Sequence, residues 1–232
     1  MIATKDFVFI HAPKTGGTFI TEALKKVYPN DLKDIADKHA YAKDIPNEYR
    51  DLPRLLSLRD PLKWYESHYL YGWWRRYPET FPGFKDIDVE NLGFFDFIKL
   101  WNKYWAKNVK EFENEDLRFG KLSFVTLLYI FDNPEPILKD VLQNGSENFW
   151  QRHKLPKNLT IIKTSDLNRS LFNFLSRFQP KEKIEFLKHQ KRIRPKDDPR
   201  GEKEIKIEID KEIKDYIDFK EPILKDLLER VK

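Results

Sequence analysis

Cysteine is absent from the 232 residues, and glycine is scarce, with eight residues. Without cysteine the chain cannot form a disulfide framework, bind a metal through thiolates or use a thiol as its nucleophile. The longest strongly apolar stretch, residues 122–131, has about half of the ~20 residues that a membrane span requires. The N-terminus also lacks the long apolar core of a signal peptide. We therefore expect a soluble, cytoplasmic protein without a membrane span.

Positive charge exceeds negative charge only slightly over the whole chain. The 43 lysines and arginines exceed the 38 aspartates and glutamates by five, which gives a pI near 9.0. This mild positive excess favours an anionic ligand, but it lacks the basic stripe that nucleic-acid-binding proteins carry. We expect no nucleic-acid partner, and the sequence leaves the oligomeric state undetermined. The length suits a single domain with a sizeable core.

Three apolar segments have the pattern of buried parallel strands: residues 7–10, 54–58 and 159–163. Each precedes a helical pattern that begins near a polar or proline cap. This alternation predicts an α/β domain with a mostly parallel sheet covered on both faces. Residues 72–157 look like a helical, aromatic-rich insertion within one domain over residues 1–232. A charged amphipathic helix is expected over 210–230, restarted at Pro222.

Two of the few glycines are adjacent in the loop between the first strand and its helix. Glycines allow backbone N–H groups to approach a ligand closely, and the N-terminus of the following helix attracts anions. The loop therefore predicts a phosphate cradle, although a simple turn with a surface lysine is the alternative. Its lysine precedes the glycines, unlike a Walker A loop, and its glycine spacing differs from the dinucleotide fingerprint. The loop residues are Pro13, Lys14, Thr15, Gly16, Gly17 and Thr18.

A second motif follows the second predicted strand, in the sequence Leu58-Arg59-Asp60-Pro61. Arg59 leaves the sheet at the carboxyl end of its strand, where open α/β sheets bind ligands. Ser67 lies two turns into the next helix. The guanidinium fork suits a phosphate group, so Arg59 and Ser67 are candidate phosphate ligands. Taken alone, the motif is also an ordinary capped helix start.

Together, the two motifs resemble the 5′-phosphosulfate loop and the 3′-phosphate motif of sulfotransferases that use 3′-phosphoadenosine 5′-phosphosulfate (PAPS). The resemblance is to the branch that includes heparan sulfate 2-O-sulfotransferase and bacterial relatives, and it covers about the first 70 residues. It implies a P-loop-like three-layer sandwich, PAPS as the sulfuryl donor and no metal. The implied reaction is in-line transfer to an acceptor hydroxyl, with a carbohydrate or glycoconjugate as the expected acceptor.

The resemblance also implies roles for individual residues. Lys14 would neutralise the charge that develops on the leaving phosphate. His39 lies in a Lys-His-x-x-Ala segment similar to one in bacterial members, so it is the candidate general base, with Glu22 as a carboxylate alternative. A late basic loop closes over the 3′-phosphate in this family. Its candidates here are Arg192, Arg194 and Arg200.

Alternatives remain open at this point. The chain is also consistent with an inactive relative that binds a nucleotide or an anionic glycan. A P-loop kinase is a further alternative, although the Lys-Ser/Thr pair after the glycines is missing. The aromatic run at residues 69–77, which includes Arg75 and Arg76, fits either an acceptor platform or ordinary helix packing within the insertion.

Overall fold

A computed structural model describes residues 1–81, 83–105, 119–191, 193 and 206–231. Its centre is a five-stranded sheet in the order β3-β1-β2-β4-β5. The strands β2, β4 and β5 pair in parallel, whereas β1 pairs antiparallel with both β2 and β3. The sheet is therefore mixed. The strand bounds are β1 Ile2–Ala3, β2 Val8–Ile10, β3 Lys33–Asp34, β4 Arg54–Leu58 and β5 Leu159–Lys163.

Three of these strands are the three apolar segments of the sequence, and they form the parallel part of the sheet. The sequence prediction of a mostly parallel sheet did not include β1 and β3, which have two residues each. Strands this short carry no hydrophobic run and no alternation, because a periodicity needs about four residues or more to show. Their two antiparallel pairings are what make the sheet mixed.

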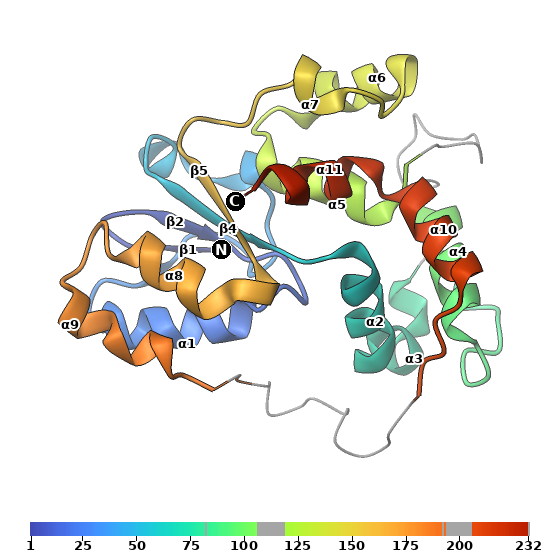
Figure 1. The fold of residues 1–232 in the computed structure, drawn as a ribbon, viewed down its shortest axis with the longest axis horizontal. Helices are drawn as coiled ribbons and strands as arrows, with labels where there is room; N and C mark the ends of the chain where they lie inside the picture. Colours follow the sequence, from blue (N-terminus) through green and yellow to red (C-terminus); the bar gives the residue numbers. More distant parts are fainter. Residues whose placement is uncertain (82, 106–118, 192, 194–205, 232) are drawn as a thin grey trace.

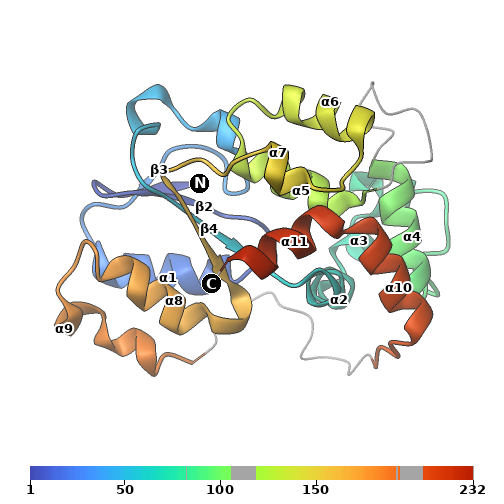
Figure 2. The same cartoon turned by 45° about the horizontal axis from the view of Figure 1, so that its top comes forward.

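Helices cover both faces of this sheet, as Figures 1 and 2 show. Successive strand side chains point to opposite faces, so Phe7 and Phe9 belong to a different core cluster from Val8 and Ile10. The Phe9 cluster packs against α1 (Gly17–Val27) and α8 (Leu167–Leu175). The Val8 cluster packs against α5 (Lys121–Ile130) and α11 (Pro222–Arg230). The architecture is thus α/β, with helices on each side of the sheet.

The segment between β4 and β5 is helical, as expected. After α2 (Pro61–Tyr71) it contains α3 (Trp73–Arg76), α4 (Phe94–Trp105), α5, α6 (Pro134–Asn144) and α7 (Phe149–Arg152). Many of its aromatic side chains are core residues, since Trp74 and Phe97 are fully buried. Helix α5 packs on α11 and contributes to the core above the sheet, so this part of the segment is integral to the domain.

The last part of the described chain forms two helices that meet at Pro222, α10 (Lys211–Lys220) and α11, as the sequence predicted. Between them, Glu221 is fully buried and caps the N-terminus of α5. Its carboxylate accepts from the Ser123 backbone N–H at 2.5 Å, from the Leu122 N–H at 3.2 Å and from the Tyr65 hydroxyl. Burial raises the pKa of Glu221 to about 7. This carboxylate joins α2, α5 and the C-terminal helices.

The remaining short elements complete the fold. No helix of the described ranges combines the length and the hydrophobicity needed to cross a bilayer. Within the described residues, the short helix α9 and several 3-10 turns connect the larger elements; they are α9 Lys181–Ile184, η1 Ala42–Asp44, η2 Asn47–Tyr49, η3 Pro78–Thr80, η5 Thr164–Asp166 and η6 Glu185–Lys188.

Candidate active site at the carboxyl end of the sheet

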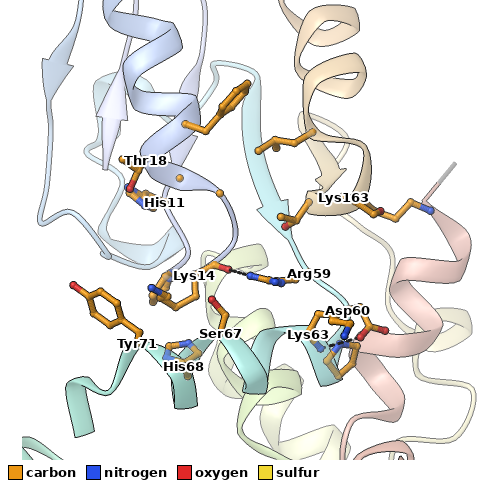
Figure 3. Close-up of a pocket in the computed structure, with 18 of the residues that line it drawn as sticks. His11, Lys14, Thr18, Arg59, Asp60, Lys63, Ser67, His68, Tyr71 and Lys163 are labelled. Carbon is orange, nitrogen blue, oxygen red and sulfur yellow. Dashed lines mark hydrogen bonds between the residues drawn. The ribbon is translucent and has the colours of Figure 1, made fainter. Parts of the chain in front are cut away.

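A pocket of about 1250 Å³ lies where the parallel strands β2, β4 and β5 end (Figure 3). Both sequence motifs reach it. A pocket for one small ligand usually has ~300–1,000 Å³, so this one has room for a nucleotide and part of a second molecule. The predicted site residues in its lining are Pro13, Lys14, Gly16, Gly17, Thr18, His39, Arg59 and Ser67.

The loop after β2 needs its glycines for steric reasons. Gly16 has a φ of 87°, and a Cβ there would lie 2.6 Å from Leu167 Cδ2. A Cβ at Gly17 would lie 1.8 Å from Nε2 and 2.0 Å from Cδ2 of His11, so it would overlap the imidazole ring. Lys14 also has a positive φ, 64°, which is unfavourable for a side chain of this kind and is often found at functional sites. The loop therefore has a tight, strained path into α1.

Two successive carbonyls of this loop are held by side chains of neighbouring elements. Trp64 Nε1 donates to the Pro13 carbonyl at 2.7 Å, and Arg59 Nη1 donates to the Lys14 carbonyl at 3.3 Å. The Thr164 hydroxyl donates to the Leu58 carbonyl at 2.8 Å and lies 3.2 Å from the Thr15 carbonyl, so the turn after β5 packs against the loop. The loop is thus tied by hydrogen bonds to α2 and to the end of β4. These bonds set its conformation before any ligand binds.

Thr15 lies in the predicted loop, but its side chain does not line the pocket. It is fully buried, and its hydroxyl donates to the Ala12 carbonyl at 2.8 Å. A threonine hydroxyl has one hydrogen, so the Ser57 hydroxyl, 2.9 Å away, is the donor in the second bond. These two bonds direct the Thr15 side chain towards β4, so the predicted ligand contact of Thr15 falls to its backbone. The side chain anchors the loop.

The second motif folds as the sequence predicted. Asp60 caps α2 by accepting from the Lys63 backbone N–H at 3.0 Å, and Pro61 occupies the first helical position. Arg59 is half-buried, and Ser67 is 3% exposed within the pocket wall. Figure 3 shows Arg59 and Ser67 on the same side of the pocket as Lys14. Two donors for an anion therefore lie next to the glycine loop.

The environment of Lys14 is partly aromatic. Its Nζ lies 3.5 Å from the centroid of the Tyr71 ring, at the end of α2. A cation over the face of an aromatic ring is stabilised by the ring quadrupole. His68, one turn earlier on α2, also lines the pocket. Its pKa is held well below the usual value, mainly by burial and to a lesser extent by the positive charge of Lys14. His68 is therefore neutral, and it packs edge-on against Trp101.

His39 reaches the pocket from the segment after α1, and its tautomer is fixed. Its Nδ1 lies 2.8 Å from the His11 backbone carbonyl. A carbonyl can only accept, so Nδ1 carries the hydrogen and Nε2 is left as the acceptor of the neutral ring. Burial lowers the pKa of His39, opposed by this hydrogen bond. A neutral imidazole with a defined acceptor nitrogen is what a general base requires.

His11 supports this arrangement from beneath. It is 4% exposed, its ring stacks on Phe9 at 5.5 Å, and it meets the His39 ring edge-on at 4.8 Å. Burial lowers the pKa of His11 to about 3, so it is neutral at physiological pH. One residue thus fills the space above Gly17 with its ring and fixes His39 with its carbonyl.

Glu22, the alternative base, is not in the pocket lining. The buried face of α1 carries Ile20 and Leu24, and Glu22 lies outside that stripe. Its carboxylate pairs with Lys25 Nζ at 2.8 Å, and both side chains are exposed. Glu22 is close to the loop in sequence, but its position on α1 places its side chain outside the pocket. The predicted cofactor contacts of Arg192, Arg194 and Arg200 fall outside the described residues.

A third wall of the pocket was not predicted. It comes from the end of β5, the start of α8 and the last turn of α11, including Lys163, Asn168, Lys225 and Leu228. Lys163 Nζ donates to the Leu228 carbonyl at 3.2 Å and to the Val231 carbonyl at 2.6 Å. These two bonds fix the C-terminal helix at the pocket. A local sequence pattern cannot predict a contact between segments about 65 residues apart.

The comparisons with known proteins add nothing to this geometry: no protein-family model, curated protein or solved structure matches the chain. Within the described ranges, no group of three or more histidines and carboxylates is placed to hold a metal ion. The chemistry of the pocket is therefore described by its own residues. Cations, hydroxyls and a helix N-terminus surround one side, which suits a phosphate-bearing ligand, and a neutral imidazole supplies a proton acceptor.

Proposed function

We propose that this chain is a PAPS-dependent sulfotransferase with a P-loop-like three-layer fold, acting on a hydroxyl of a carbohydrate or glycoconjugate. One observation carries the proposal. A single pocket brings together the glycine loop after β2, the Arg59 and Ser67 pair after β4, and the His39 imidazole. Sulfuryl transfer from this donor needs a binding site for each of its two phosphate-bearing ends and a general base.

The donor set fits both anionic ends of PAPS. Gly16 and Gly17 line the pocket at the start of the 11-residue helix α1. Its N–H groups and helix dipole suit the 5′-phosphosulfate. Arg59 and Ser67 suit the 3′-phosphate, because a guanidinium binds phosphate with paired donors. When bound, PAPS supplies the sulfuryl group and departs as 3′-phosphoadenosine 5′-phosphate (PAP).

The chain's own residues then have defined tasks. His39 Nε2 takes the proton of the acceptor hydroxyl as the acceptor oxygen bonds to sulfur. The sulfur–oxygen bond to the phosphate breaks, and its electron pair stays on the phosphate oxygen. The Lys14 ammonium offsets the charge that grows on this oxygen. The bonds that hold the loop carbonyls keep these groups in position, so little reorganisation accompanies the reaction.

Ligand binding tests the proposal without knowledge of the acceptor. Calorimetry without added magnesium should show PAP binding about 30- to 1,000-fold more tightly than AMP. AMP lacks the 3′-phosphate that Arg59 and Ser67 would bind, and losing these charge-assisted hydrogen bonds costs roughly 2–4 kcal/mol. Ser67→Ala should reduce this preference, whereas the exposed control Lys25→Ala should leave it unchanged. Equal affinities for PAP and AMP would contradict the proposal.

An acceptor screen with labelled PAPS tests the reaction itself. Transfer of label to a saccharide hydroxyl supports the enzyme. PAP binding without label transfer to any acceptor favours the inactive, nucleotide-binding relative. Transfer of phosphate from ATP in the presence of magnesium favours the kinase alternative, for which the loop lacks the Lys-Ser/Thr pair.

A further inference from the structure

The mouth of the pocket carries exposed aromatic rings. Of the large apolar side chains in the described ranges, four are exposed, and Trp73 and Tyr77 are two of them, at 40% and 41%. Their rings lie 4.4 Å apart, and Trp73 lines the pocket. Neighbouring apolar side chains left exposed next to a pocket are typical of a binding surface. We refer to Tyr71, Trp73, Arg76 and Tyr77 as the Trp73 strip.

The strip begins at the proposed reaction centre. Tyr71 holds the Lys14 ammonium at 3.5 Å from its ring centroid, and its ring is within 6° of parallel to that of Trp73, at 6.3 Å. Gly72, with a φ of 64°, ends α2 and starts α3. This turn places Trp73 at the pocket edge while Trp74 enters the core. A molecule lying on Trp73 is therefore close to Lys14.

The strip is also positively charged. The Arg76 guanidinium carbon lies 5.0 Å from the Tyr71 ring and 5.3 Å from the Trp73 ring, and Nη2 donates to the Tyr71 carbonyl at 3.3 Å. Among the described residues, no carboxylate forms an ion pair with Arg76. An arginine held beside exposed rings suits a ligand that combines an apolar face with an anionic group.

We propose that the Trp73 strip is the acceptor subsite and that it takes an acidic saccharide. This inference rests on the proposed function. The C–H face of a sugar ring would lie on the Trp73 indole, and a carboxylate or sulfate on the same or the next sugar would pair with Arg76. A neutral sugar would contact the ring but would give the arginine no anionic partner. The pocket volume, larger than one small ligand needs, accommodates this second substrate beside the nucleotide.

Binding of defined oligosaccharides tests the subsite without turnover. The probes are a hexasaccharide of alternating glucuronate and N-acetylglucosamine, and the neutral hexasaccharide of N-acetylglucosamine, titrated into the PAP-loaded protein by calorimetry. We expect the acidic probe to bind about tenfold more tightly. Trp73→Ala should weaken both probes about tenfold, because both use the ring. Arg76→Gln should weaken the acidic probe alone, about tenfold, and so remove the preference.

The chain offers a matched control on α10. Phe219 is 59% exposed and has Lys220 Nζ 5.5 Å from its ring, so it is a second exposed ring with a cation, outside the pocket lining. Phe219→Ala should leave both affinities unchanged. Three results would overturn the inference: equal affinity for the two probes, a loss of affinity in Phe219→Ala as large as that in Trp73→Ala, or failure to bind either probe.

The two proposals fail in different ways. If PAP is still preferred to AMP but neither saccharide binds, the acceptor subsite is wrong while the proposed function stands. If the PAP preference is absent, the proposed function itself fails. An acidic, tyrosine-containing peptide is the third probe. If this peptide alone binds in a Trp73-dependent way, the strip is an acceptor site of a different class and the saccharide assignment is refuted.

Discussion

Replacing Gly17 with alanine would place a methyl group in steric overlap with the His11 ring. The added Cβ would lie 1.8 Å from Nε2 and 2.0 Å from Cδ2 of His11, where ordinary contacts begin near 3.4 Å. The backbone itself accepts alanine, because Gly17 is the first residue of α1 and has no positive φ. Helix propensity would favour alanine by about 1 kcal/mol. The whole cost therefore comes from displacing the imidazole.

That displacement is expensive because His11 has no free space. The ring is 4% exposed, stacked on Phe9 and in edge contact with His39. Overpacking of a close-packed interior costs ~1–3 kcal/mol, and more where backbone must move. A ring that must shift by more than 1 Å belongs at the upper end of that range. We expect a loss of about 3 kcal/mol, or roughly 6–12 °C in Tm for a domain of this size.

Urea unfolding followed by tryptophan fluorescence measures this loss. Gly93→Ala is the matched control, because its Cβ would meet only Asp96 Oδ2 at an ordinary 3.8 Å, and we expect a change within about 0.5 kcal/mol. His11→Ala removes the obstructing ring, so adding Gly17→Ala to it should cost nothing further. If Gly17→Ala matches the control, or if the two changes are additive, the steric reasoning is refuted.

Three further predictions concern single side chains. Lys14→Ala should lower turnover about 100- to 1,000-fold with an unchanged urea midpoint, since one preorganised donor to developing charge is worth ~2.7–4 kcal/mol; near-normal turnover would exclude this role. His39→Ala should lower turnover about 100- to 10,000-fold at unchanged PAP affinity, and His39→Gln should not rescue it, because an amide cannot take the proton. The raised pKa of Glu221, about 7 against an ordinary 4.5, means that the folded state binds its proton more tightly than the unfolded state. Its contribution to stability should therefore fall as pH rises from about 4.5 to 7, by roughly 3 kcal/mol, and Glu221→Gln should remove this fall; a difference between wild type and variant that does not change with pH would contradict it.

The predicted part of the fold is the part with strong local patterns. Each of the three apolar runs became a parallel strand, and the Asp60-Pro61 pair became a helix cap with the expected hydrogen bond to the Lys63 N–H. The break at Pro222 divided the C-terminal helix as expected. The strands β1 and β3 were missed because two residues cannot show a period. Their pairing depends on contacts between chain segments, which a local pattern does not record.

The candidate site also has a part that the sequence predicted and a part that it did not. Motif spacing brought Lys14, Arg59 and Ser67 to one pocket, because consecutive parallel strands end at the same edge of a sheet. The direction in which individual side chains point was less predictable. Thr15 belongs to the same loop, yet its side chain bonds to Ala12 and Ser57 behind it. Glu22 follows the loop closely, yet it faces away, and the apolar stripe of α1 was a signal that could have shown this.

The structure joins the glycine loop and His39 into one packed unit, which neither motif shows by itself. The His11 ring occupies the space that the missing side chain of Gly17 leaves, and the His11 carbonyl holds Nδ1 of His39 at 2.8 Å. A displacement of His11 therefore acts on both the loop and His39. Because the proposed role of His39 as a base needs Nε2 as its acceptor, losing the carbonyl bond would release the tautomer as well as the position of the ring. Gly17 is thus required as much for the position of His39 as for the path of the loop.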